Sequence, residues 1–155
     1  MANGLERFVA RAAERGLEVE AVAFPDGTRT AADAAAAIGC DVAQIVKSLV
    51  FVADGTPVLV LTSGANQADE RRLAHALGAE EVRIATPAEV REATGYAIGG
   101  TPPVGHDTDL RVLCDRDLTD HDQVWAAAGT PTHVFGLTPQ RLVEATGAEV
   151  ADLAS

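Results

Sequence analysis

The chain has 155 residues, of which 47% are hydrophobic, and a formal net charge of −11. This length and hydrophobic content suffice for a substantial core, so we expect a single domain over residues 1–155. Proteins that bind many phosphates present basic surface, and the acidity therefore argues against a large nucleic-acid footprint and against DNA as a partner.

The hydropathy pattern and the cysteines indicate a cytoplasmic protein. No window of 18 residues is apolar, and Glu6 and Arg7 stand where a signal peptide needs its apolar stretch. We therefore expect no membrane partner. Cys40 and Cys114 lie far apart without CxxC spacing, which predicts small buried side chains and neither a disulfide framework nor a zinc site.

Apolar spacing and end signals predict the elements of the first half of the chain. In order, these are a helix over residues 4–15, a strand over 19–24 that ends in the turn PDGT, a helix over 30–39 and two strands over 46–53 and 57–63. The second helix begins with Thr30-Ala-Ala-Asp33, which resembles a capping box. The sequence Asp-Gly-Thr joins the last two strands and predicts a hairpin. Lys47 is therefore expected at the beginning of a central strand.

The second half of the chain is punctuated in the same way. Its expected elements are a helix over 69–77, a strand over 82–85, a helix over 86–95, strands over 110–114, 123–128 and 133–137, a helix over 138–147 and an edge strand over 148–154. Helices scattered between a hairpin and a run of strands predict a mixed sheet, of class α+β or mixed α/β. The modest basic neighbourhood of Arg71, Arg72, Arg83 and Arg91 is interpreted as a solvated face paired with nearby acidic residues.

Several site chemistries lack their sequence signals. The chain has no GxxxxGK, and GGTPPVG follows a predicted helix where a dinucleotide fingerprint would follow a strand. The four histidines show neither HxxxH nor HxH spacing, and Ser63 is not part of a GxSxG motif. We therefore expect no metal, no organic cofactor and no serine hydrolase. A nucleophile built from cysteine and histidine is unsupported but stays open.

Two features remain, a lysine and a loop. Lys47 is the only lysine of the chain and lies within the apolar run QIVKSLVF. Its charge could face a phosphate or a developing oxyanion, or its stem could simply snorkel from a strand end. In the loop of residues 95–105, glycines would let backbone N–H groups approach a substrate and prolines would hold the shape. The alternative is an ordinary connection between a helix and a strand.

Four segments together resemble a known family. QIVKSLVF, LTSGAN, ATGYAIGGTPPVG and VWAAAGTPTHVFGLTPQRL, in this order, are similar to segments of the YbaK/EbsC-type aminoacyl-tRNA deacylases, relatives of the editing domain of bacterial prolyl-tRNA synthetases. The resemblance runs from about Val19 to Ala151. It implies a curved mixed β-sheet surrounded by helices, a pocket for the 3′ end of an aminoacyl-tRNA, hydrolysis of the aminoacyl ester, and no metal or organic cofactor.

The resemblance also implies roles for particular residues. The essential lysine of the family matches Lys47, and its GxxxP loop matches Gly99 to Pro103, although the consecutive prolines here depart from the usual pattern. Candidate substrate-binding residues are Thr30, Ser63, Gly64, Asn66, Gly99, Gly100, Pro103, Gly105, Gly129 and Thr130. Thr30 could equally be only an N-cap. His133 is interpreted as a structural strand residue, whereas Phe24 and Tyr96 could line the pocket or belong to the core.

These features lead to an enzymatic hypothesis. An aminoacyl ester is already activated by its ammonium and the ribose hydroxyl, so positioning and charge stabilisation suffice without a catalytic triad. We expect trans-editing of mischarged aminoacyl-tRNA, with proline tRNA carrying alanine or cysteine as the substrate and a prolyl-tRNA synthetase as a candidate partner. The alternative is a non-catalytic module of the same fold that binds aminoacyl-tRNA or a synthetase. A small-ester hydrolase of another kind is a weaker third hypothesis, because nothing supplies its nucleophile.

Overall fold

A computed structural model describes residues 4–24 and 30–155. The turn expected at PDGT lies outside the described residues. The described helices are α1 (Gly4–Glu14), α2 (Ala31–Ile38), α3 (Glu70–Leu77), α4 (Pro87–Thr94) and α5 (Pro139–Thr146), with 3-10 turns η1 (Val42–Gln44) and η2 (Arg116–Asp120). The strands are β1 (Val22–Ala23), β2 (Ile45–Ala53), β3 (Thr56–Ser63), β4 (Val82–Ile84), β5 (Arg111–Asp115), β6 (Val124–Ala127), β7 (His133–Leu137) and β8 (Glu149–Ala151).

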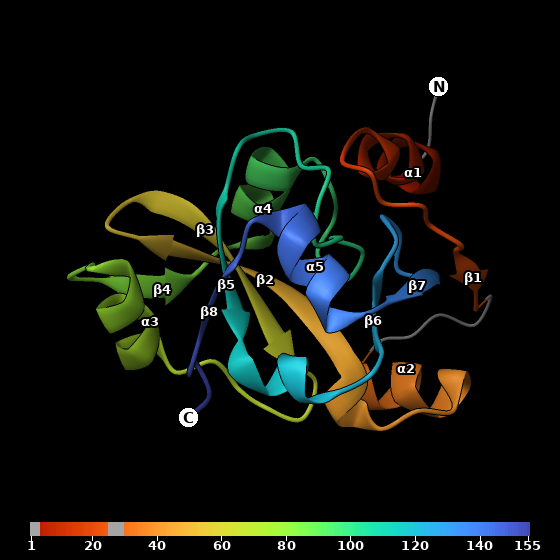
Figure 1. Cartoon of the computed structure of the whole chain (residues 1–155). Helices are drawn as coiled ribbons and strands as arrows, with labels where there is room; N and C mark the ends of the chain where they lie inside the picture. The colour runs from red at the N-terminus through yellow and green to blue at the C-terminus, as the bar shows by residue number, and fades with distance from the viewer. Residues whose placement is uncertain (1–3, 25–29) are drawn as a thin grey trace.

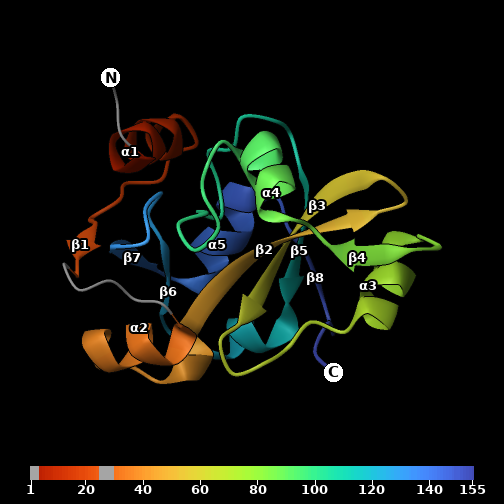
Figure 2. The ribbon, with the colours of Figure 1, turned by 180° about the vertical axis from the view of Figure 1, so that it is seen from behind.

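The strands form one mixed sheet in the order β1-β7-β6-β2-β3-β5-β8, and β4 pairs with the outer half of β2. The hairpin β2–β3 is antiparallel, whereas β6 runs parallel to β2 and β5 runs parallel to β3. Figure 1 and the reverse view in Figure 2 show the long β2 curving through the sheet with helices on both sides. The expected α+β class and the curved mixed sheet are confirmed.

Alternate residues of β2 face different cores, as a period of two requires. Val50 and Val52 pack in the large core, to which α1, α4 and α5 contribute. Phe51 packs in a second core with Leu73 of α3. A third, smaller cluster packs α2 on Ile45. The sheet therefore carries packed side chains on both faces. The beginning of β2, next to α2, contributes to the third, smaller cluster as well as to the large core.

Threonine side chains cap the starts of α2 and α4. The Thr30 side chain accepts a hydrogen bond from the Asp33 N–H, and Thr86 and Glu89 form a capping box at the start of α4. The strand expected over residues 19–24 is reduced to the two residues of β1, which pair with the first two residues of β7. The strand expected over 110–114 begins and ends one residue later, so that Asp115 belongs to it. Within residues 4–24 and 30–155, no helix combines the length and the apolarity needed to cross a membrane.

Candidate active site

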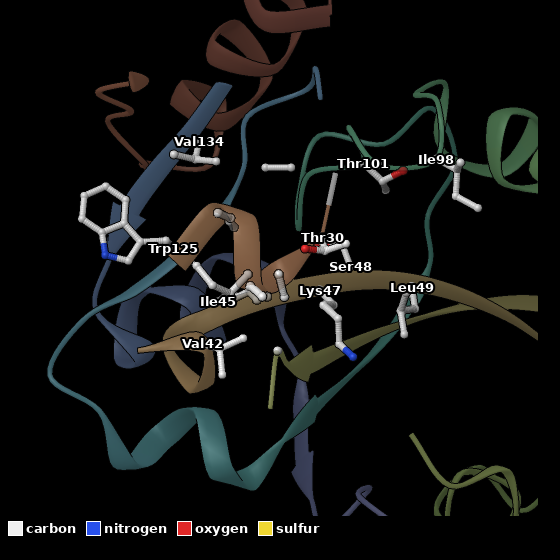
Figure 3. Close-up of a pocket in the computed structure, with 18 residues that line it drawn as sticks. Thr30, Val42, Ile45, Lys47, Ser48, Leu49, Ile98, Thr101, Trp125 and Val134 are labelled. Carbon is white, nitrogen blue, oxygen red and sulfur yellow. The ribbon is translucent and has the colours of Figure 1, made fainter. Parts of the chain in front are cut away.

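A cavity of about 530 Å³ opens between α2, the first half of β2, the loop after α4 and the strands β6 and β7. Figure 3 shows the side chains that line it. Most of them are apolar, including Val42, Ile45, Ile98, Trp125 and Val134. The polar side chains in the lining are Thr30, Lys47, Ser48 and Thr101. A cavity of this size and composition is typical of small-molecule sites, in which a few polar groups fix the orientation of a largely apolar contact.

Lys47 lies at the edge of this cavity. It is the third residue of β2 and pairs with Thr62 of β3. Its amine donates a 2.6 Å hydrogen bond to the backbone carbonyl of Asn66. Figure 3 shows this amine directed away from Thr30 and Ser48. Burial lowers the pKa of Lys47 below its ordinary value, and the nearby negative charge of Asp115 partly opposes that shift.

A buried carboxylate holds the segment that receives the lysine. Asp115, only 1% exposed, accepts hydrogen bonds from the Ser63 N–H at 3.1 Å and from the Asn66 Nδ2 at 2.9 Å. Asn66 Nδ2 also donates to Asp117 Oδ2 at 2.7 Å, and Ser63 Oγ donates to the Ala43 carbonyl at 2.8 Å. The polar side chains of Ser63 and Asn66 thus bind within the protein, where they fix the position of the lysine's acceptor.

Two site residues were missed from the sequence, Ser48 and Asp115. The Oγ atom of Ser48 lies buried in the cavity wall without a hydrogen-bond partner among the described residues. Leaving a buried hydroxyl unsatisfied costs about 1–3 kcal/mol, which a polar group of a bound molecule can recover. Ser48 stands beside Lys47 in the motif QIVKSLVF, and an acidic residue directly after a predicted strand is the signal that marks Asp115.

The Gly95–Gly105 loop forms another wall of the cavity. Its residues Ile98, Gly99 and Thr101 line the space. Gly100 instead packs on the turn between β6 and β7, where an added Cβ would lie 2.9 Å from the Thr130 Cα. The position that a Cβ of Gly100 would occupy therefore faces backbone and not the cavity, and contact between Gly100 and substrate stays a prediction.

The remaining candidate residues divide into two groups. Thr30, Lys47, Gly64 and Gly99 line the cavity together. The others lie outside its lining, and three of them pack elsewhere in the fold. Gly105 lies against Arg11, Gly129 lies against Gly4, and the Thr130 hydroxyl hydrogen bonds with His133 Nδ1 at 2.7 Å. Pro103 is buried beside a separate small cavity that also contains His106. Their direct contact with substrate stays a prediction.

The cysteines do not suit nucleophilic catalysis. Burial raises the pKa of the Cys114 thiol to about 12, and burial also raises the pKa of Cys40. A thiol must ionise to attack, so both side chains are poor nucleophiles near neutral pH. Over the part of the chain that the structure describes, no group of three or more histidine, cysteine, aspartate or glutamate side chains is arranged to hold a metal ion.

Comparison with known proteins identifies the family. Residues 25–145 match the sequence model of the aminoacyl-tRNA editing domain. The chain belongs to this family. The proline–tRNA ligase of Nitratidesulfovibrio vulgaris strain DP4 is 36% identical over 123 residues, which are 77% of this chain and 21% of the ligase. The ligase of Lactobacillus helveticus strain DPC 4571 is 34% identical over 135 residues, 87% of this chain and 24% of the ligase. The chain spans less than a quarter of the length of either ligase.

Solved structures give the same family and extend the likeness to whole chains. One described as a proposed trans-editing enzyme for prolyl-tRNA synthetase has a TM-score of 0.94 and 46% identity, over 100% of this chain and 99% of that one. A scaffold protein from an epitope-grafting design study has a TM-score of 0.92 and 39% identity, over 100% and 99% of the two chains. The family that the four sequence segments of this chain predicted is confirmed.

Proposed function

We propose that this protein hydrolyses the ester bond of mischarged aminoacyl-tRNA in trans, with proline tRNA carrying a small amino acid such as alanine or cysteine as its substrate. The observation that carries the proposal is the largely apolar cavity of about 530 Å³ with Lys47 at its edge, in a chain of the editing-domain family. The near-complete overlap with a proposed trans-editing enzyme supports action as a separate protein.

In the proposed reaction, water attacks the ester carbonyl carbon, the bond to the ribose oxygen breaks, and a proton of the water passes to that oxygen, which releases the amino acid and a tRNA with a free 3′-terminal hydroxyl. The reaction needs a held ester and a stabilised oxyanion more than a strong nucleophile. An ammonium carries three N–H donors, and among the described residues Asn66 is the one hydrogen-bond partner of Lys47. Two donors are therefore left for a phosphate or carbonyl oxygen at the cavity edge.

The walls of the cavity support a small substrate side chain. Ile45, Trp125 and Val134 provide apolar contact area, and the unsatisfied Ser48 hydroxyl provides a polar contact once it rotates toward the cavity. Alanine and cysteine side chains suit such a surface, because neither brings a charge that would have to be buried. A prolyl-tRNA synthetase is the proposed partner, since this acidic chain offers little basic surface of its own to hold the body of a tRNA.

One observation favours the non-catalytic alternative. The Lys47 amine is directed away from Ser48 and toward Asn66, so a molecule seated deep in the cavity would not meet its charge in this conformation. The two functions are separated by comparing a 3′-alanyl ester of adenosine with its amide-linked analogue, which resists hydrolysis. Hydrolysis of the ester together with binding of the amide supports the enzyme. Binding of both without release of alanine would support the binding module and contradict the proposal.

A further inference from the structure

Helix α1 holds both ends of the Gly95–Gly105 loop. A guanidinium nitrogen of Arg7 donates to the Gly95 carbonyl. One turn further along the helix, Arg11 donates to the Gly105 carbonyl at 2.9 Å and forms an ion pair with Asp107 at 2.7 Å. Residues four apart lie on one face of a helix. One helical face therefore contacts both points at which the loop begins and ends.

An aromatic side chain of the loop joins the two contacts. The Arg7 guanidinium lies over the Tyr96 ring, 4.5 Å from its centroid. The Tyr96 hydroxyl donates to the same Gly105 carbonyl that Arg11 binds, at 3.0 Å. An aromatic ring attracts a guanidinium that lies over its face, and the stacking fixes the orientation of the planar group. Both arginines and Tyr96 thus form one connected set of contacts, which we call the α1 clamp.

The helix that carries the clamp is itself fixed. Phe8 is fully buried and its ring packs on Phe135 of β7, with 5.0 Å between centroids. Gly4 lies so close to Gly129 that an added Cβ would overlap the Gly129 carbonyl oxygen. Because α1 packs on the core and on the turn after β6, its arginines project from a rigid base.

The part of the loop between the clamped ends forms the cavity wall. Ile98, Gly99 and Thr101 line the cavity, yet the Ile98 side chain is 57% exposed and gains little from burial. The family match covers residues 25–145 and begins after α1, so the two arginines of the clamp lie outside the matched segment whereas Tyr96 lies inside it. The loop wall therefore depends on a helix that the matched segment does not include.

We propose that Arg7 and Arg11 are positioning residues that keep the Gly95–Gly105 loop in its substrate-binding conformation. The effect of the clamp on the loop conformation does not depend on the reaction, whereas its effect on the reaction rests on the proposed deacylase function. When a clamp contact is removed, the loop spends part of its time in conformations that lack the cavity wall. The apparent affinity for substrate then falls by the fraction of competent molecules, while the rate at saturation is kept.

The experiment compares Arg7→Ala, Arg11→Ala and the double variant with three references. Arg15→Ala removes an arginine that follows α1 and donates to the Ala145 carbonyl of α5. Phe8→Leu replaces the buried ring with a smaller apolar side chain, which lowers the stability of the fold but leaves α1 packed on the core and the clamp contacts in place. Arg7→Lys keeps the charge at Arg7 but loses the planar contact with Tyr96.

Two readouts are taken, amide hydrogen exchange over residues 96–104 and steady-state deacylation. The Gly100 N–H, which donates to the Ala97 carbonyl at 3.0 Å, reports the loop conformation. The double variant is expected to exchange in this segment about tenfold faster, with KM raised about tenfold and kcat within about twofold of the wild type. Arg7→Lys should be intermediate, and Arg15→Ala and Phe8→Leu should keep the wild-type exchange and KM.

Unchanged exchange in the double variant would overturn the clamp. A fall in kcat at constant KM would overturn its positioning role, as would an equal rise in KM for Phe8→Leu. If the wild type hydrolyses no aminoacyl ester, the proposed function fails, and hydrogen exchange still decides whether the clamp exists.

Discussion

The amine of Lys47 and the backbone carbonyl of Asn66 lie 2.6 Å apart and form a hydrogen bond across the end of the β2–β3 hairpin. Asn66 is in turn bound to the buried Asp115 and to Asp117. A lysine within an apolar run is thereby accommodated, because the strand leads its amine to a polar edge where a fixed acceptor and a negative charge compensate for the loss of water.

The first prediction concerns the charge of Lys47. Lys47→Met keeps most of the apolar stem and removes the ammonium, so we expect most of the deacylation rate to be lost while the melting temperature changes little. Burial lowers the pKa of Lys47, which means that the charged form is disfavoured in the fold and that its removal costs little stability. Lys47→Arg should fail as well, since its planar guanidinium is larger than the compact ammonium. Single-turnover deacylation and circular dichroism measure both properties. A folded Lys47→Met with near wild-type turnover would exclude the proposed role.

Adjacent glycines of the loop provide the second prediction. An alanine at Gly100 would place its Cβ 2.9 Å from the Thr130 backbone, and we expect Gly100→Ala to lose about 1–3 kcal/mol of stability through overpacking. Residual activity should follow the folded fraction. Gly99 has open space but a φ of +87°, so Gly99→Ala costs roughly 1–2 kcal/mol in backbone strain and alters the cavity wall directly. Its activity per folded molecule should fall. Lost turnover in a Gly100→Ala protein that melts like the wild type would instead support approach of substrate to this glycine.

Local sequence signals were sufficient for most of the fold. The Thr30 cap and the Asp-Gly turn of the hairpin act within a few residues and could be interpreted directly. The two-residue β1 could not be predicted in length, because its bounds are set by pairing with β7, about 110 residues away in the chain.

The site was only partly predictable for the same reason. Lys47 was found because a charge in an apolar run is locally anomalous. The contacts of Arg7 and Arg11 with the loop join residues 88 and 94 positions apart, and no local pattern signals them. Gly99 and Gly100 are equivalent as sequence letters, and only the packed turn at Thr130 distinguishes the glycine that lines the cavity from the one that packs on backbone.

A pH dependence of stability forms the third prediction. Burial lowers the pKa of His106, with smaller contributions in the same direction from Arg15 and Arg11, whereas the Pro102 carbonyl and Asp107 act in the opposite direction. The His106 Nε2–H donates to that carbonyl at 2.7 Å. Between the folded pKa and the unfolded value of about 6.5, the unfolded state binds more protons. The contribution of His106 to stability is therefore complete above about pH 6.5 and is lost as the pH falls below it.

Melting curves at about pH 7.5 and about pH 5.5 check this dependence, because the two conditions lie on either side of the unfolded pKa. His106→Gln serves as the control, since its amide can donate to Pro102 but does not titrate in this range. The wild type should lose more stability on acidification than His106→Gln. Equal losses in the two proteins would assign the pH dependence to other groups.

The fourth prediction follows from the net charge of −11. If the protein grips only the terminal nucleotide and its amino acid, the slope of log affinity against log salt should be about −1 to −2. A short aminoacylated mimic of the acceptor end should then react at a rate within about tenfold of whole tRNA, a difference of roughly 1.4 kcal/mol. If a synthetase instead supplies the contacts to the rest of the tRNA, adding the synthetase should accelerate the reaction of whole tRNA only.

Phosphate contacts made by the modest basic neighbourhood would contradict the small salt slope of the fourth prediction. Arg83 pairs with Glu89 at 2.8 Å, whereas Arg71, Arg72 and Arg91 are exposed. A slope of about −5 for the isolated protein would show that several phosphates are contacted, with these dispersed arginines as the candidate residues.

Deacylation of a defined panel of tRNAs tests the central claim most directly. Proline tRNA charged with alanine, cysteine, serine or proline is incubated with the wild type, with Lys47→Met and with buffer, and the remaining ester is measured over time. We expect the wild type to release at least one of the three wrong amino acids about a hundredfold faster than Lys47→Met, because removing one charge-stabilising donor typically costs about 10²–10³ in rate. It should spare prolyl-tRNA, because an editing enzyme must discriminate against the correctly charged ester. Ester lifetimes equal to those in buffer for every member of the panel, in the presence of folded protein and of prolyl-tRNA synthetase, would contradict the proposed function.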